Sequence, residues 1–127
     1  MNRILVVEDL EDDLVLMRRA LSRSGRTFDL RVARDGQEAV DLLSNQSWLP
    51  HLVLLDLKLP KLSGFDVLET VQHTLPTMIK LVVVSSSDEP GDIDKAMSLG
   101  AAEYVQKPVA PEEYLSTIGE LCRRYLP

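Results

Sequence analysis

The chain has a single cysteine, Cys122, and no hydrophobic run long enough to cross a membrane. One thiol cannot form a disulfide within the chain, so reducing, intracellular surroundings are expected. The N-terminal residues also lack a signal-peptide pattern. Together these absences predict a cytoplasmic protein that does not associate with a membrane.

Positive charge is scarce as well. Acidic residues outnumber basic ones by 20 to 14, and the net charge of −6 argues against non-specific binding to nucleic acid. No glycine-rich turn follows the first hydrophobic run, where Glu8 and Asp9 would instead repel a dinucleotide phosphate. With 45% hydrophobic residues, the 127 positions suit one domain that needs neither disulfides nor a structural metal.

Short hydrophobic runs alternate along the chain with segments of helical periodicity. The predicted strands are Ile4–Val7, Phe28–Ala33, Leu52–Leu57, Lys80–Ser85 and Tyr104–Gln106. The predicted helices begin near Leu10, Asp35, Phe65, Asp88 and Pro111. Five strands alternating with five helices predict an α/β fold, with a parallel sheet covered by helices on both faces.

Polar residues stand where these buried strands end. Asp56 follows the apolar run Leu52–Leu55, Ser85 closes the fourth strand, and Lys107 follows the fifth. Glu8 and Asp9 follow the first strand in the same way. Ligands of open α/β sheets bind outside the carboxyl ends of the strands, so these side chains are expected to meet in one crevice.

Three carboxylates in one crevice would repel one another, and some would stay protonated unless a cation intervened. An all-oxygen set, Glu8, Asp9 and Asp56, favours Mg²⁺, with Mn²⁺ as the alternative. Lys107 supplies a second positive charge. Asp56 is then a candidate nucleophile toward phosphorus, and the Ser85 hydroxyl could donate to a phosphoryl oxygen on it.

Four strings of residues carry a family resemblance over essentially the whole chain. They are Val6-Val7-Glu8-Asp9, Leu54-Leu55-Asp56-Leu57-Lys58-Leu59-Pro60 with Gly64, Val83-Val84-Ser85 and Tyr104-Val105-Gln106-Lys107-Pro108. With these strings the chain resembles the receiver domain of two-component response regulators. The resemblance implies a flavodoxin-like sheet of strand order 2-1-3-4-5, and residues 1–127 are expected to form a receiver domain without an output domain.

The resemblance also assigns roles at the site. Asp56 would accept a phosphoryl group from the phosphohistidine of a sensor histidine kinase, in a reaction that the domain itself catalyses, as it would the later dephosphorylation. Asp9, Asp56 and the backbone carbonyl of Lys58 would bind Mg²⁺, and Glu8 would act mainly through water. The protein is therefore expected to be a phosphoacceptor and not an enzyme with a separate substrate.

Further expectations concern the switch that follows phosphorylation. Ser85 and Lys107 would contact the phosphoryl group, Tyr104 would turn inward, and the Lys107–Pro108 peptide bond would be cis. The surface of helix four, strand five and helix five would then bind a downstream effector, or a second copy of the chain in a homodimer.

A finer resemblance is to the stand-alone regulators that pair with bacterial phytochromes, which makes the expected kinase a phytochrome. Leu14 and Met17 are candidates for contact with it at helix one. Asp12 and Asp13 are interpreted as capping acids of that helix.

Two alternatives remain open at this stage. A phosphatase of the haloacid-dehalogenase type also uses an aspartate nucleophile, but it needs an acid two residues later, where this chain has Lys58. A receiver-shaped interaction module that is never phosphorylated would show the same hydrophobic pattern, and only the complete set of acids, hydroxyl and lysine argues against it.

Overall fold

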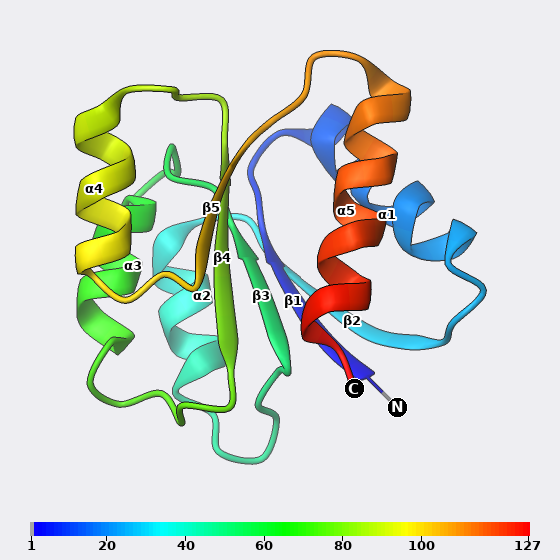
Figure 1. The fold of residues 1–127 in the computed structure, drawn as a ribbon. Helices are drawn as coiled ribbons and strands as arrows, with labels where there is room; N and C mark the ends of the chain where they lie inside the picture. The colour runs from blue at the N-terminus through cyan, green and yellow to red at the C-terminus, as the bar shows by residue number, and fades with distance from the viewer. Residues whose placement is uncertain (1) are drawn as a thin grey trace.

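The computed structural model describes residues 2–127 and contains one five-stranded parallel sheet of order β2-β1-β3-β4-β5 (Figure 1). The strands are β1 (Asn2–Val7), β2 (Phe28–Ala33), β3 (Leu52–Leu55), β4 (Lys80–Ser85) and β5 (Glu103–Gln106). The helices are α1 (Glu11–Arg23), α2 (Gly36–Leu43), α3 (Gly64–Val71), α4 (Pro90–Ser98) and α5 (Pro111–Tyr125). The predicted fold class, strand order and alternation of elements are confirmed.

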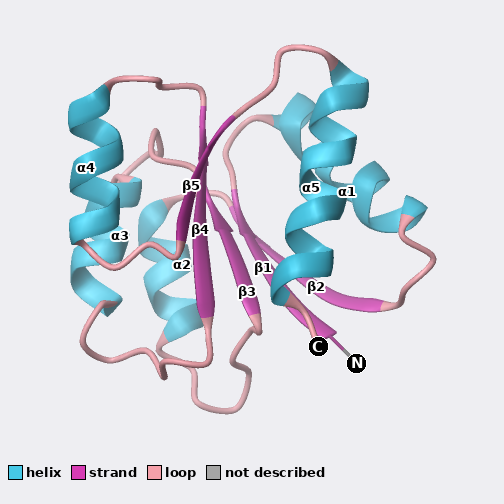
Figure 2. Cartoon of the chain, viewed as in Figure 1, coloured by secondary structure: helices cyan, strands magenta, loops and turns pink. Residues whose placement is uncertain are grey.

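Helices cover both faces of the sheet. Figure 2 shows α1 and α5 on one face and α2, α3 and α4 on the other. Successive residues of a strand point to opposite faces, so Leu5 packs in the core beneath α2 and α3 while Ile4 and Val6 pack beneath α1 and α5. This arrangement explains why β3 and the buried part of β1, Ile4–Val7, are continuously apolar and do not alternate.

The strand register brings the carboxyl ends together. Val7 pairs with Leu55, so the next residues, Glu8 and Asp56, leave neighbouring strands at the same level. The Asp56 amide still donates to the Val7 carbonyl, at 3.0 Å, and the Lys107 amide donates to the Ser85 carbonyl, at 2.8 Å. The ends of four strands, β1, β3, β4 and β5, thus meet at one edge of the sheet.

The third strand is shorter than predicted. It ends at Leu55, whereas the sequence pattern extends to Leu57. Its partner β1 ends at Val7, and the Leu57 amide donates to the Asp56 side chain instead of to a neighbouring strand. Leu57 is nevertheless buried, which explains the apolar pattern.

One predicted helix cap is confirmed, one cap was not predicted, and one predicted cap is wrong. Asp35 caps α2 by accepting from the Glu38 amide at 2.8 Å, and Ser63 and Asp66 form a reciprocal capping box at α3. At α1 the capping position is held by Leu10, which has no side-chain cap. The expectation that Asp12 or Asp13 caps this helix is therefore wrong, because both lie inside its first turn, where acids suit the helix dipole.

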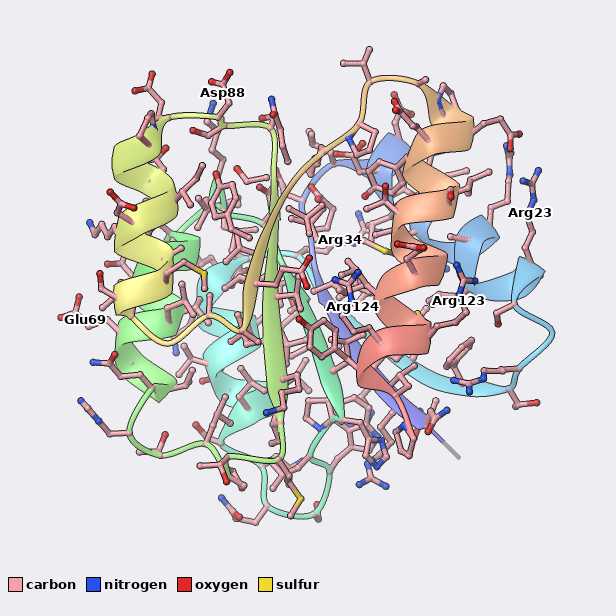
Figure 3. The ribbon with its side chains drawn as sticks, viewed as in Figure 1. Arg23, Arg34, Glu69, Asp88, Arg123 and Arg124 are labelled. Atoms are coloured by element: carbon pink, nitrogen blue, oxygen red, sulfur yellow. The ribbon has the colours of Figure 1, made fainter. Side chains whose placement is uncertain are left out.

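Charges differ between the two helical layers. In Figure 3, Arg23 and Arg123 lie on the side of α1 and α5, whereas Glu69 and Asp88 lie on the side of α3 and α4. An ion pair between Arg23 and Glu112, at 3.1 Å, links α1 to α5 at the surface.

Among residues 2–127 no helix is long and apolar enough to cross a membrane.

Candidate functional site

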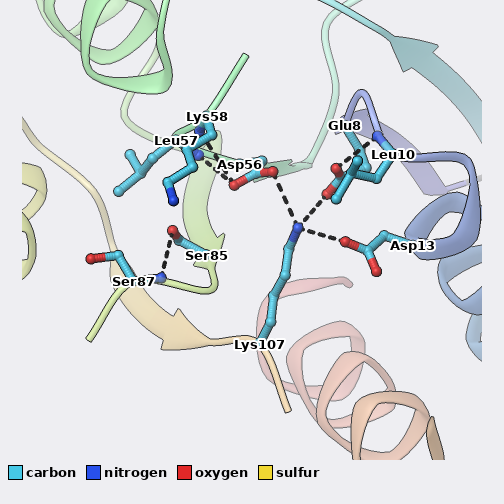
Figure 4. Close-up of polar contacts among 9 residues, drawn as sticks. All are labelled: Glu8, Leu10, Asp13, Asp56, Leu57, Lys58, Ser85, Ser87 and Lys107. Carbon is cyan, nitrogen blue, oxygen red and sulfur yellow. Dashed lines mark hydrogen bonds and ion pairs between the residues drawn. The ribbon is translucent and has the colours of Figure 1, made fainter. Parts of the chain in front are cut away.

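Asp56 is a buried carboxylate directly behind β3. It is 6% exposed, and its two oxygens have different partners. Oδ1 accepts from the Leu57 amide at 2.7 Å, and Oδ2 accepts from Lys107 Nζ at 3.1 Å (Figure 4). These two bonds fix the orientation of a side chain that is expected to act as a nucleophile.

Lys107 lies at the centre of the acidic groups. Its ammonium donates to Glu8 Oε2 at 2.8 Å, to Asp13 Oδ2 at 2.7 Å and to Asp56 Oδ2 at 3.1 Å (Figure 4). An ammonium has three N–H donors, so all of its donor capacity is used. The Lys107 side chain is only 10% exposed, which strengthens these interactions relative to a surface ion pair.

Burial and mutual interaction shift the pKa values of this cluster. Burial raises the pKa of Glu8 to about 7, the hydrogen bond from Lys107 opposes the shift, and the charge of Asp56 adds to it. Burial lowers the pKa of Lys107, but hydrogen bonds to Asp13 and Glu8 and the charge of Asp56 outweigh it and hold that pKa above its ordinary value. Lys107 therefore stays charged while Glu8 titrates near neutral pH.

Ser85 and Tyr104 both contact the loop after β4. Ser85 is fully buried, and its Oγ accepts from the Ser87 amide at 3.2 Å. Tyr104 is half-buried, and its hydroxyl donates to the Ser87 carbonyl at 2.8 Å. Ser87 thus links the two predicted switch residues, and within residues 2–127 neither of them hydrogen-bonds to Asp56.

The predicted metal ligands are brought together only in part. Glu8 and Asp56 both bind Lys107, whereas Asp9, the residue after Glu8, is exposed to solvent. Among residues 2–127, no group of three or more histidine, cysteine or acidic side chains is arranged to hold a metal ion. The donor chemistry still fits a hard cation, because two buried carboxylates share one lysine and the Lys58 carbonyl follows Asp56 closely in the chain.

The Lys107–Pro108 peptide bond is trans, since residues 2–127 contain no cis peptide bond. The expectation of a cis bond at Pro108 is therefore wrong. Trans is the lower-energy form even before proline, by roughly 0.5–1 kcal/mol, and with a trans bond Lys107 already reaches all three carboxylates.

Two residues have roles here that the sequence interpretation missed. Asp13, which was expected to cap α1, binds Lys107. It directly precedes the buried Leu14 and therefore lies at the edge of the core-facing side of α1, a signal that the sequence already contained. Gly64 was expected only as part of the receiver-like string around Asp56. A Cβ at this position would lie 2.4 Å from the Asp56 carbonyl oxygen and 2.7 Å from Leu57 Cα, so the loop behind Asp56 requires glycine.

The expected kinase contacts on α1 are also revised. Leu14 and Met17 are each 2% exposed and belong to the core, so they are wrong as docking residues. They sit on the face of the helix that packs against the sheet and α5. The exposed apolar residues of this segment are Leu10 and Val15.

A parallel sheet of this order, with acids after β1 and β3 and a lysine after β5, defines a flavodoxin-like protein of the receiver class. The response regulator receiver domain family matches residues 4–119, and the chain belongs to this family.

Similar proteins are known both by sequence and by structure. The chain is 34% identical to the alkaline phosphatase synthesis transcriptional regulatory protein PhoP of Bacillus subtilis, over 96% of its own length and 49% of PhoP, so it spans about half of that relative. The Mn²⁺-bound form of the response regulator Rcp1 is 29% identical, with a TM-score of 0.90 over 99% of this chain and 95% of that one. The phosphorylated cyanobacterial phytochrome response regulator RcpA is 30% identical, with a TM-score of 0.91 over 98% and 94%.

Proposed function

We propose that this protein is a response regulator that receives a phosphoryl group on Asp56 from a sensor histidine kinase. The observation that carries the proposal is the buried Asp56 carboxylate, which accepts one hydrogen bond at each oxygen. The Leu57 amide donates to Oδ1, and the Lys107 ammonium lies 3.1 Å from Oδ2. An oxygen of Asp56 attacks the phosphorus of the phosphohistidine, a P–O bond forms, and the P–N bond breaks with its electron pair left on the imidazole. Hydrolysis by water later returns the carboxylate and inorganic phosphate.

The residues of the crevice divide the work of this reaction. Lys107 neutralises charge on the transferring group, and the backbone amide of Leu57 holds Asp56 in position. Ser85, in the neighbouring strand end, donates from its hydroxyl to a phosphoryl oxygen. The domain thereby promotes its own phosphorylation and dephosphorylation without a separate general base.

A divalent ion completes the proposed site. Asp9, Asp56 and the Lys58 carbonyl would hold it, with Glu8 acting through water, and the all-oxygen donors favour Mg²⁺ over softer metals. When bound, the ion would neutralise negative charge on the phosphoryl oxygens. Rcp1 has been seen with Mn²⁺, which supports a divalent ion in this family and leaves Mn²⁺ as the second choice.

The partners are proposed from the same relatives. Rcp1 and RcpA, both response regulators, are matched over nearly their whole chains, which supports the same role for residues 4–119 of this chain. RcpA is a phytochrome response regulator, and this supports a phytochrome as the kinase. The proposed place of the reaction is the cytoplasm. The output would be a changed surface on α4, β5 and α5 that binds an effector protein or a second copy of the chain.

Phosphorylation is tested by mass. The protein is incubated with Mg²⁺ and acetyl phosphate, and the expected result is a gain of one phosphoryl group that disappears in Asp56→Asn. Asp41→Asn is the matched control, because Asp41 is exposed on α2 and its side chain accepts a hydrogen bond from Gln37 on the same helix. No gain in the wild type with acetyl phosphate or phosphoramidate would support the unphosphorylated interaction module instead.

The output surface is tested by NMR. With Mg²⁺ and beryllofluoride, the amide resonances of α4, β5 and the start of α5 are expected to move more than those of α2. The physical reason is that the Tyr104 hydroxyl is bonded to the Ser87 carbonyl next to Ser85, so drawing Ser85 toward Asp56 disturbs that bond. Unchanged resonances on α4 and β5 would contradict the proposed output.

A further inference from the structure

The loop between β3 and α3, residues 57–63, directly follows Asp56 and contains the Lys58 carbonyl, which is a proposed metal ligand. The two ends of the loop are tied together, because the Leu57 carbonyl accepts from the Gly64 amide at 2.8 Å. The middle of the loop is mostly exposed to solvent. Its position relative to Asp56 therefore depends on whatever contacts the middle of the loop makes with the rest of the fold.

The first residue of α2 makes such a contact. The Gly36 amide donates to the Pro60 carbonyl at 3.2 Å, and within residues 2–127 this is the one backbone hydrogen bond that joins the middle of the loop to another element. The first amides of a helix have no acceptor inside the helix, so the Gly36 N–H is available to the loop. Gly36 is buried, which keeps water away from this bond.

Gly36 also packs against the loop more closely than any other residue type could. A Cβ at this position would lie 2.6 Å from the Leu62 carbonyl carbon and 2.6 Å from Leu62 Cβ, and it would overlap the Leu62 carbonyl oxygen. Gly36 is not among the glycines with positive φ, so its backbone conformation does not require glycine. The close approach of α2 to the loop is the feature that requires it.

Lys61 lies between the two loop residues that Gly36 contacts, and its backbone is strained. Its φ of 67° is the one positive φ of a non-glycine residue in the part of the chain that the structure describes. Such a conformation persists only where the surroundings hold it. Lys61 Nζ lies 3.5 Å from Asp35 Oδ2, but the Lys61 side chain is 68% exposed, so this ion pair contributes little. The packing of Gly36 is the stronger restraint.

We propose that the start of α2 holds the loop of residues 57–63 in its metal-binding conformation, and that Gly36 is a positioning residue for phosphoryl transfer to Asp56. This inference rests on the proposed function, in which Asp56 and the Lys58 carbonyl hold a divalent ion. Lys58 lies midway in the chain between Asp56 and Pro60, so a displacement of the loop at Pro60 moves the Lys58 carbonyl relative to the Asp56 carboxylate. Gly36 acts through the loop and supplies no ligand.

The first test measures amide hydrogen exchange of the wild type by NMR, with and without Mg²⁺. Mg²⁺ and the bond from Gly36 to Pro60 stabilise the same loop conformation, so each strengthens the other. Mg²⁺ is expected to slow exchange of the Gly36 amide by about fivefold or more. The Glu38 amide is the internal control, because its acceptor is the Asp35 side chain and not the loop, and its exchange rate should not change.

The second test compares Gly36→Ala with Leu43→Ala, a change at the last residue of the same helix. Leu43 is buried, so its truncation destabilises the protein without adding an atom next to the loop. The Mg²⁺ affinity, measured from the amide resonances of Leu57 and Lys58, should fall about tenfold or more in Gly36→Ala. In Leu43→Ala it should stay within about twofold of the wild type, which separates positioning of the loop from a general loss of stability.

Three outcomes overturn the inference alone. One is a wild type that binds Mg²⁺ while its Gly36 amide exchanges as fast as before. The others are a folded Gly36→Ala protein with the Mg²⁺ affinity of the wild type, and a Leu43→Ala protein that loses as much affinity as Gly36→Ala. If Gly36→Ala does not fold, the exchange rates of the wild type decide. A wild type that neither binds Mg²⁺ nor gains a phosphoryl group from acetyl phosphate refutes the proposed function, and this inference with it.

Discussion

Lys107 carries one positive charge and faces three carboxylates, those of Glu8, Asp13 and Asp56. Full ionisation of all three would leave excess negative charge in a nearly closed site, which is costly where solvent screening is weak. The cost appears at Glu8, the most deeply buried of the three, whose pKa is raised to about 7. Replacing the Glu8 carboxyl with an uncharged group should therefore change how the free energy of unfolding depends on pH.

In protein kept metal-free with a chelator, Glu8 favours the folded state at low pH. Its folded pKa of about 7 exceeds the ordinary value of 4.5, so its contribution is complete below pH 4.5 and is lost as the pH rises through 7. Relative to the wild type, Glu8→Gln should gain about 3 kcal/mol of unfolding free energy between these pH values. Urea unfolding at a series of pH values measures the difference.

Glu69→Gln is the control for this series, because Glu69 is exposed on α3, on the opposite side of the sheet from α1 and α5 (Figure 3). Its stability should follow that of the wild type at every pH. Parallel curves for the wild type and Glu8→Gln would show that Glu8 is not the group that titrates in the folded protein.

Gly64 supports the same site through its missing side chain. Gly64→Ala should lower the unfolding free energy by about 1–3 kcal/mol or more, because its Cβ would overlap the backbone of Asp56 and Leu57. Gly91→Ala on α4 is the matched control, since a Cβ there meets nothing within 4 Å, and it should be neutral or stabilise by up to about 1 kcal/mol. Equal effects at the two glycines, measured by urea unfolding, would contradict the packing argument.

At the scale of the elements, the helices begin in different ways. α2 and α3 have side-chain caps, from Asp35 and Ser63, whereas α4 and α5 begin with a proline in the first turn. α3 starts immediately behind the Asp56 loop, where the Gly64 amide donates to the Leu57 carbonyl at 2.8 Å. The capping box at α3 therefore fixes the helix and the loop that carries Asp56 together.

Ser63→Ala removes one half of that capping box. The expected cost is about 1 kcal/mol of unfolding free energy, because the Asp66 amide loses its acceptor. Ser98→Ala on α4 is the control, since the Ser98 hydroxyl bonds back to the Asp94 carbonyl and contributes little to the helix. Thermal or urea unfolding of the two variants decides the matter, and a loss at Ser98 as large as that at Ser63 would argue against the cap.

At the scale of the whole molecule, the candidate site lies at the carboxyl end of the sheet, and Trp48 lies at the opposite end. Asp56 leaves the carboxyl end of β3, while Trp48 lies in the segment that enters its amino end. Trp48 is buried, its indole N–H donates to Asp29 at 2.8 Å, and the Arg31 guanidinium lies 4.4 Å from the ring centroid. Neither of these two contacts involves Lys107 or the three carboxylates that Lys107 binds.

Trp48 fluorescence should therefore report unfolding and not metal binding. Adding Mg²⁺ to the folded wild type is expected to leave the emission nearly unchanged, whereas urea should shift it as the ring becomes exposed. Trp48→Phe supplies the blank for both titrations. Strong quenching by Mg²⁺ that is absent from Trp48→Phe would show that the two ends of the sheet are coupled.

The sequence predicted the elements well because their causes are local. Hydrophobic period, helix-capping acids such as Asp35 and prolines at helix starts act over a few residues, so the five strands and five helices could be placed from the printed order of residues. The error at β3, which ends two residues early, arose where an apolar residue, Leu57, is buried without belonging to the sheet.

The sequence predicted which residues come together at the site, but not which hydrogen bonds and ion pairs they form. Polar residues at strand ends indicated that Asp56, Glu8 and Lys107 would meet, since parallel strands end at one edge. The sequence alone could not show that Asp13 binds the same lysine, that Leu14 and Met17 are buried, or that Lys107–Pro108 is trans.

By itself, then, the sequence determined the order of elements and the chemistry gathered at one end of the sheet. The tertiary structure decided which acids Lys107 binds, and why Gly64 and Gly36 have no room for a side chain. The physical reason is distance along the chain. The bonds of Lys107 join residues 51, 94 and 99 positions apart, and such contacts exist only after the sheet has placed its strands side by side.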